Sequence, residues 1–119
     1  MADIRMGPVE SQFAEIIWEH EPIASGELAK LAETALQWKK TTSFTVLKRL
    51  CERGLFQNEK GCVTSLVSRK EYYALHSEHY VEETFGGSLP AFLAAFGTHK
   101  KLSDGEIEEM KALIDKMRG

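Results

Sequence analysis

The chain has 119 residues, of which 43% are hydrophobic and 28% are charged. This length predicts one compact unit with at most a small appendage, and the balance of hydrophobic and charged residues excludes an intrinsically disordered chain. The formal net charge is −3, so the overall charge gives no reason to expect a nucleic acid or another polyanion as a partner.

Three helices are expected in the first half of the chain. The first spans about residues 8–19, because a proline suits its first turn and apolar residues then recur at helical spacing. The second begins near Ser25, a good N-cap residue, and residues 33–38 are the expected turn after it. The third spans about residues 40–53, and Gly54 fits its C-cap.

The third predicted helix has two faces of different chemistry. One face should point to the core, because apolar or small residues recur on it at helical spacing: Ser43, Val46, Leu47 and Leu50. The same spacing repeats on another side, which is polar and basic and carries one aromatic ring: Thr41, Phe44, Thr45 and Lys48. The helix is therefore expected to bury one side in the core and to expose its polar, basic side to a partner.

Two short strands are expected after this helix, at residues 55–59 and 63–67. Lys60 and Gly61 lie between them and predict a tight hairpin. Three helices followed by a hairpin is the order of a winged helix-turn-helix. Residues 1–70 are therefore assigned to a winged-helix DNA-binding domain in a mostly α-helical protein.

The second half of the chain is expected to be helical. An S-x-x-E capping box at residues 68–71 starts a helix that should reach about Thr84 and end at two glycines. A short helix follows Ser88, and a second capping box at residues 103–106 starts the last helix. That last helix carries a coiled-coil-like seam with one further apolar residue, Leu113, beside it: Ile107, Met110, Ile114 and Met117.

Location and redox state follow from what the sequence lacks. The most apolar short run, residues 91–96, is far too short to span a bilayer. Residues 1–7 are short, mixed and include Asp3, so they do not fit a secretory signal. Cys51 and Cys62 lack the spacing of metal ligands. A cytoplasmic protein with reduced thiols, no membrane insertion and no cofactor is expected.

Positive charge is concentrated in one segment. Residues 39–60 contain six basic and two acidic side chains, a net charge of +4, whereas residues 1–38 contain two basic and seven acidic ones, a net charge of −5. This uneven distribution favours a polyanionic partner although the total charge does not. The alternative is that these lysines and arginines only solvate a helix face.

The composition of the third helix suits DNA recognition. In a helix-turn-helix the second helix of the motif enters the major groove and its N-terminal half meets the base edges. Thr41 and Thr45 can hydrogen-bond bases or contact a thymine methyl group, on which Phe44 can also pack. Lys40 and Lys48 can reach guanine or phosphate. The alternative for Phe44 is an ordinary, partly buried core ring.

Other residues in and near this helix are candidates for contacts with the DNA backbone. Lys39 and Arg49 flank the reading side and are better candidates for phosphate contacts. Lys60, at the tip of the predicted wing, can touch the backbone or the minor groove. Thr42 is either a further reading residue or a helix cap.

The remaining reactive residues give weaker signals. His76 and His79 are three residues apart, with Glu82 and Glu83 close behind, which allows a metal pair but is more typical of a solvated helix face. Cys51 is expected to be a small core residue, and Cys62 an exposed residue of the hairpin. The sequence contains no nucleophile elbow, phosphate loop or H-E-x-x-H motif, so no enzymatic activity is expected.

The chain resembles the penicillinase repressor family of bacterial transcription regulators (the BlaI/MecI/CopY group) over nearly its whole length. The most specific segments lie in the second half, at residues 67–72, 85–89 and 102–115. In the first half the matching positions are Glu10, Trp18, Trp38 and residues 41–50. No single segment is decisive, but their order and spacing together identify the resemblance.

The resemblance implies a homodimeric repressor whose winged helix binds a palindromic operator on double-stranded DNA. Residues 71–119 would then form a helical dimerisation region. Its apolar residues are the candidates for the contact between the two copies: Phe85, Leu89, Phe92, Leu93, Phe96, Ile107, Met110, Leu113, Ile114 and Met117. Dimerisation would also explain the seam on the last helix, which a lone chain of this size would struggle to bury.

The resemblance also implies a route of induction. In antibiotic-responsive members of the family, a membrane-bound sensor protease triggers cleavage within the C-terminal helices. The corresponding bond here is Ala95–Phe96. Cutting it would detach the last helix, reduce the dimer contact and weaken bivalent DNA binding.

The chain departs from the family pattern at several positions. The family usually has asparagine at the position of Ala95, and its recognition helix commonly begins Ser-Pro-Lys where this chain reads Lys-Lys-Thr at residues 39–41. The expected wing is about three residues shorter, and Cys62 replaces a common arginine. The C-terminus lacks the cysteines of the copper-responsive branch, which argues against copper sensing.

Two other readings of the sequence stay open at this stage. Winged helices also serve as protein-interaction modules, and the acidic residues 1–38 would suit a basic protein partner. Alternatively, the chain is a DNA-binding repressor that responds to a metal, a ligand or thiol oxidation through His76, His79 or Cys62.

Overall fold

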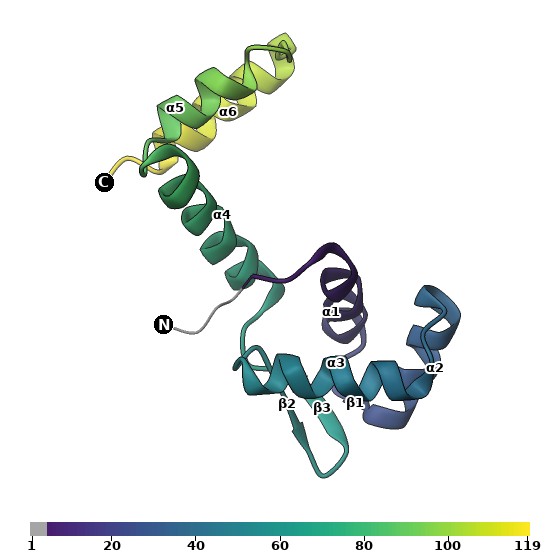
Figure 1. Cartoon of the computed structure of the whole chain (residues 1–119). Helices are drawn as coiled ribbons and strands as arrows, with labels where there is room; N and C mark the ends of the chain where they lie inside the picture. Colours follow the sequence, from purple (N-terminus) through teal and green to yellow (C-terminus); the bar gives the residue numbers. More distant parts are fainter. Residues whose placement is uncertain (1–4) are drawn as a thin grey trace. The chain divides into compact units, whose positions relative to one another are not determined.

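Six helices and three short strands make up the described part of this computed structural model, residues 5–119 (Figure 1). Residues 1–4, which contributed to the expectation about a secretory signal, lie outside it. In chain order the elements are α1 (Pro8–His20), β1 (Ile23–Ala24), α2 (Ser25–Leu36), α3 (Lys40–Glu52), β2 (Phe56–Glu59), β3 (Cys62–Ser65), α4 (Arg69–Phe85), α5 (Leu89–Phe96) and α6 (Asp104–Lys116). The predicted class, mostly helical with a winged helix first, is confirmed. Among the described residues no helix is both long and apolar enough to cross a membrane.

The chain divides into two compact units whose boundary falls inside α4, after Ser77. The N-terminal unit holds α1 to α3, the sheet and the first part of α4. The C-terminal unit, Glu78–Gly119, holds the rest of α4 with α5 and α6. The predicted functional division at residue 70 stays a prediction.

The core of the N-terminal unit lies between the three helices and the sheet. The predicted inner face of α3 is confirmed, because all four of its residues are buried, including the polar Ser43, which is 2% exposed. They meet buried side chains of α1 and of the strands: Phe13, Ile17, Phe56 and Val63. Aromatic rings continue this core, since Phe13 stacks on Trp38 at 5.1 Å between ring centroids. The outward face of α3 therefore has a rigid support.

The sheet is small and antiparallel, with the strand order β1-β3-β2. The predicted hairpin is confirmed: Lys60 and Gly61 form a two-residue turn with φ of 51° and 81°. Positive φ at both central positions is what a type I′ hairpin turn requires, which explains the glycine. The predicted strands were too long, because Leu66 and Val67 leave the ladder and donate their amides to the Leu55 carbonyl.

Two expectations about α2 were wrong. Its N-cap is Ala24, and Ser25 is already its first residue, because the Ser25 amide donates to the Gly61 carbonyl at 2.8 Å and fixes the chain where it leaves the sheet. The helix also continues through most of the expected turn to Leu36. Alanine is the strongest helix former, and Ala35 and Leu36 lie in the extension, where Leu36 packs against the core; Gln37 then ends the helix in the left-handed conformation.

The ends of the other helices agree with the sequence signals. After α3, Gly54 has φ of 79°. Its amide donates to the Cys51 carbonyl and the Leu55 amide donates to the Leu50 carbonyl, which together form a Schellman motif. The Glu71 amide donates to Ser68 Oγ at the start of α4. The capping box between Ser103 and Glu106 is complete at the start of α6.

Candidate nucleic-acid interface

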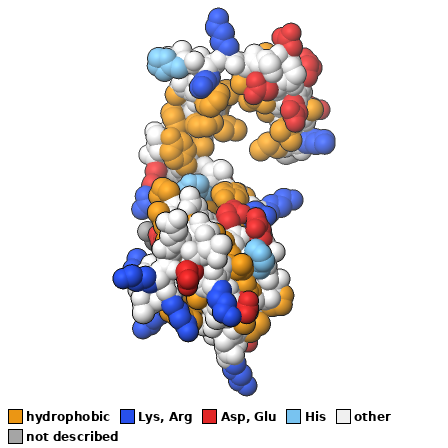
Figure 2. Space-filling view, turned by 90° about the vertical axis from the view of Figure 1, so that its right-hand side faces the viewer, with side chains coloured by type: hydrophobic (Ala, Val, Ile, Leu, Met, Phe, Trp, Pro, Cys, Tyr) orange, Lys and Arg blue, Asp and Glu red, His pale blue; other side chains and the backbone are white. Residues whose placement is uncertain are grey.

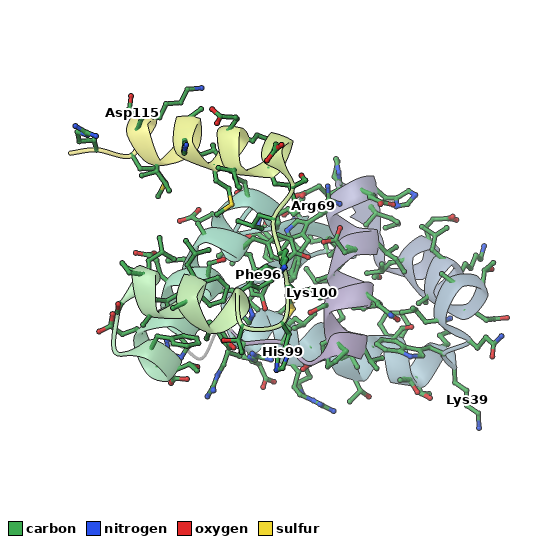
Figure 3. All side chains as sticks on the ribbon, turned by 90° about the horizontal axis from the view of Figure 1, so that it is seen from above. Lys39, Arg69, Phe96, His99, Lys100 and Asp115 are labelled. Atoms are coloured by element: carbon green, nitrogen blue, oxygen red, sulfur yellow. The ribbon has the colours of Figure 1, made fainter. Side chains whose placement is uncertain are left out.

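All nine residues predicted to contact DNA have exposed side chains. Eight lie on α3 or directly before it, and one lies at the hairpin tip: Lys39, Lys40, Thr41, Thr42, Phe44, Thr45, Lys48, Arg49 and Lys60. The buried stripe on the opposite side of α3 imposes this exposure, since a helix that buries one face must present the other to solvent. In Figure 3 Lys39 points away from the ribbon into solvent.

The positive charges of this surface are not neutralised by acids in the described part of the chain. Within residues 5–119, none of the five cations of the surface forms an ion pair: Lys39, Lys40, Lys48, Arg49 and Lys60. Elsewhere in the same unit cations are paired, as Arg53 with Glu10 at 3.4 Å and Arg69 with Glu15 at 2.7 Å. Five of the six positive charges in residues 39–60 therefore stay available for a partner, and the sixth, Arg53, is paired.

The start of α3 is electrostatically unfavourable for the isolated chain. The N-cap is Lys39, its side chain accepts no amide hydrogen, and the first turn contains no acid. Lys39 and Lys40 thus place two positive charges at the positive end of the helix dipole, which costs about 0.3–1 kcal/mol each. An anion held at this end would reverse that cost. The alternative reading of Thr42 as the helix cap is wrong, because Lys39 occupies that position.

The polar groups of α3 present defined chemistry to a partner. The Thr45 hydroxyl donates to the Thr41 carbonyl at 2.9 Å. The hydroxyl proton of Thr45 is therefore engaged within the helix. The oxygen lone pairs and the methyl group of Thr45 stay accessible for contact with the edge of a base. Phe44 lies outside the buried core with 37% of its surface exposed, and Lys40 Nζ lies 5.9 Å from the centre of its ring.

The hairpin extends the surface beyond α3. In Figure 1 the strands β2 and β3 project past the helix, with Lys60 in the turn between them. Figure 2 shows Lys and Arg side chains along this lower end of the N-terminal unit. Helix α3 and the hairpin together have the composition of a reading helix and a wing.

A pocket lies between α3 and β2. Its volume is about 200 Å³, and it is lined by residues of both elements: Phe44, Leu47, Lys48 and Cys51 from α3, and Asn58 from β2. The sequence analysis did not single out Asn58. The signal was present, because alternate residues of a strand share a face and Phe56, two residues earlier, is fully buried on the side of the core.

Residues that hold the wing in place were also missed. The Glu21 carboxylate, directly after α1, accepts hydrogen bonds from the amide and the hydroxyl of Ser65, both at 2.8 Å. Trp18 Nε1 donates to the Val67 carbonyl at 3.0 Å. These contacts join residues more than forty positions apart in the chain, a relation that local sequence patterns do not encode. They fix the hairpin against α1.

The other reactive residues form no second site in the described part of the chain. No group of three or more metal-ligating side chains occurs there. His79 Nε2 lies 2.9 Å from Glu83 Oε1, whereas His76 stacks on Tyr72. Cys51 packs partly buried against the core, and burial raises the pKa of its thiol. Cys62 is exposed, as predicted.

The C-terminal unit leaves its apolar side chains uncovered. No residue of Glu78–Gly119 is buried, and the ten residues predicted for dimerisation are half-buried or exposed, up to 72% for Met117. Aromatic rings of α4 and α5 contact one another, as Tyr80, Phe85 and Phe92 do. Figure 2 shows hydrophobic side chains on both sides of a hollow in this unit, and in Figure 3 α6 stands apart from α5.

The bond predicted for cleavage lies in the last turn of α5. Ala95 and Phe96 are both exposed, and Gly97 caps the helix directly after them. The segment that follows leads to α6 through His99 and Lys100 (Figure 3). A break at this bond would separate α6 from the rest of the chain.

Comparison with known proteins gives a consistent result. The sequence profile of a family described as penicillinase repressor matches residues 6–116. The chain is 24% identical to the penicillinase repressor of Bacillus licheniformis over 115 residues, which cover 93% of this chain and 90% of that protein. It is 22% identical to the methicillin resistance regulatory protein MecI of Staphylococcus aureus over 111 residues, with 90% of each chain covered.

Proposed function

The chain belongs to the penicillinase repressor family, and we propose that it represses transcription as a homodimer bound to a palindromic operator. The observation that carries the proposal is the uncompensated positive charge of α3 on an acidic protein. Positive charge beside a helix N-terminus destabilises the helix, and an anionic partner would offset that cost. The phosphates of DNA are anions that would supply such a partner.

The mechanism is steric and involves no chemical reaction. Helix α3 would lie in the major groove, with Thr41 and Thr45 near base edges and Arg49 at the phosphates. Lys60 would meet the backbone beside the groove. If all five cations contact phosphate, the logarithm of affinity should fall with the logarithm of salt concentration with a slope of about −4.5 per protomer and about −9 per dimer. The bound dimer would block access to the promoter.

The exposed apolar residues of the C-terminal unit support the dimer. A unit of this length that buries no residue gains too little free energy from apolar burial to offset the conformational entropy that it loses on folding. A second copy would supply the missing apolar contacts to α5 and α6. Two-fold symmetry of such a dimer predicts two equal half-sites in the operator.

Proteolysis after Ala95 is the proposed route of induction, through a membrane-bound sensor protease. The exposed position of this bond at the end of α5 supports the proposal, because a protease needs access and a helix end unfolds more easily than its middle. A chain that ends at Ala95 mimics the cut product. It should be monomeric in sedimentation and should bind the operator far more weakly than the full chain.

Fluorescence anisotropy tests the DNA-binding proposal directly. The first probe is the duplex upstream of the protein's own gene, with a scrambled duplex beside it, and a random-duplex selection supplies the operator if neither binds. Arg49→Ala should weaken binding to all sequences, whereas Thr45→Ala should also change sequence preference, by about 1–3 kcal/mol per lost base contact. Lys70→Ala removes an exposed cation of α4 and is the matched control.

Two results would contradict the proposal. One is a failure of the wild-type chain to select any duplex at low salt. The other is equal binding to every sequence, with no difference between Arg49→Ala and Lys70→Ala, which would favour a protein-interaction module instead.

A further inference from the structure

We propose that the pocket between α3 and β2 reads a thymine in each half-site, by receiving its 5-methyl group. The inference rests on the proposed DNA-binding function and goes beyond it, because it names the base and adds a wing residue, Asn58, to the reading surface. It also explains why an aromatic ring is exposed on a polar helix face.

The position of the pocket is the first argument. Phe44 and Lys48 are one helical turn apart on α3, and both belong to the exposed surface that also carries Thr41 and Thr45. Asn58 lines the same pocket from the wing. The pocket therefore opens on the side of the reading face that is next to the hairpin, where the edge of a base pair would enter between helix and wing.

The chemistry of the pocket is the second argument. Its inner part is formed by the Phe44 ring, the buried Leu47 and the thiol of Cys51. Because burial raises the pKa of the Cys51 thiol, this inner part carries no charge at neutral pH. Lys48 and Asn58 supply an ammonium and a carboxamide to the same pocket. The result is an uncharged apolar surface bordered by the Lys48 ammonium, which only donates hydrogen bonds, and by the Asn58 carboxamide, which both donates and accepts them.

Only one base offers the complementary edge in the major groove. Thymine presents its 5-methyl group beside the O4 acceptor. The methyl group would lie on Phe44, and O4 would accept from Lys48 or Asn58. Cytosine places an N4 donor where thymine has O4, so it would bring a donor toward the Lys48 ammonium, which cannot accept a hydrogen bond. Adenine and guanine have no methyl group to fill the pocket.

Deoxyuridine substitution tests this reading atom by atom, because uracil lacks only the methyl group of thymine. Each thymine of a duplex selected by the full-length protein is replaced in turn, and affinities are measured by fluorescence anisotropy. One position in each half-site should lose about fourfold in affinity, the value expected for one buried methyl group. Replacing both symmetric thymines should cost about sixteenfold, as two independent losses.

Variants of the protein assign the effect to the pocket. In Phe44→Ala the cost of uracil at that position should disappear, and in Phe44→Leu, which keeps an apolar surface, most of it should remain. Circular dichroism confirms that each variant is folded. Replacing the same thymine by 5-methylcytosine keeps the methyl group and exchanges the acceptor for a donor, which the Lys48 ammonium cannot accommodate, so this penalty should shrink in Lys48→Ala. Lys70→Ala, which removes an exposed cation that does not line the pocket, is the control.

Distinct outcomes separate this inference from the function on which it rests. A uracil penalty that Phe44→Ala leaves unchanged at every position overturns the thymine reading and leaves DNA binding intact. Selected operators without a thymine at a symmetric position do the same. A wild-type chain that selects no duplex overturns both.

Discussion

The lysine at the start of α3 should cost folding stability while it favours DNA binding, and Lys39→Asp separates the two effects. Lys39 has extended backbone angles, φ −67° and ψ 151°, the conformation of an N-cap residue. Aspartate at this position can accept an amide hydrogen of the first turn, which is worth about 1 kcal/mol. Reversing the charge at the positive end of the helix dipole adds about 0.6–2 kcal/mol, the lower part of which applies to an exposed residue. The free energy of unfolding should therefore rise by about 1.5–2 kcal/mol.

The same substitution should weaken DNA binding. It removes one cation per protomer and places a carboxylate beside a phosphate. The slope of log affinity against log salt should become less negative by about 0.9 per protomer, or about 1.8 for a dimer on its operator. Stability and affinity should thus change in opposite directions.

Urea unfolding and fluorescence anisotropy measure the two quantities. The protein concentration is held constant, since the stability of a dimer depends on it. Lys39→Ala is the control, because it removes the charge without adding a cap and should lower affinity with less gain in stability. A Lys39→Asp protein that is no more stable than wild type, or that binds DNA with an unchanged salt slope, would refute the account of this helix end.

Two further predictions concern the core and the last helix. Leu50→Ala removes a fully buried side chain of α3 and should lower the free energy of unfolding by about 2–5 kcal/mol in urea denaturation. The exposed Leu113 lies on the last helix, which a chain that ends at Ala95 lacks, so that shorter chain offers no equivalent substitution. At the start of α6, hydrogen bonds from Ser103 lower the pKa of Glu106 below its ordinary value of 4.5. The fold therefore favours the ionised carboxylate. Its contribution to the stability of α6 is present above pH 4.5 and is lost as the pH falls through the lowered pKa. The Ser103 amide chemical shift should follow this titration in NMR spectra, and Glu106→Gln should abolish it; a midpoint at or above 4.5 would contradict the capping box.

Local patterns were enough to predict most elements. The inner face of α3 was correctly predicted because a helix buries residues at a period of 3.6, so hydrophobicity along the sequence reports burial directly. The hairpin turn and the starts of α5 and α6 were predicted for a similar reason, since glycine at positive φ and serine at an N-cap satisfy backbone requirements within a few residues.

The expectations that failed depended on contacts between distant segments. The start of α2 is set by the hydrogen bond from the Ser25 amide to the Gly61 carbonyl. Strand β1 has only two residues, and it pairs with β3, which is distant from it in the sequence. The extension of α2 places Leu36 against the rest of the core. A propensity is a weak preference, and tertiary packing overrides it at such boundaries.

By itself the sequence determined the fold class, the buried and exposed sides of α3 and the family resemblance, because these depend on periodicity and on the order of short motifs. Only the tertiary structure decided which charges stay available. Arg53 is paired with Glu10 and Arg69 with Glu15, while the cations of α3 have no such partner among the described residues. It also decided that Asn58 joins Phe44 and Lys48 at one pocket. An ion pair or a pocket needs atoms within a few ångströms, and only the folded chain brings residues that are far apart in sequence to that distance.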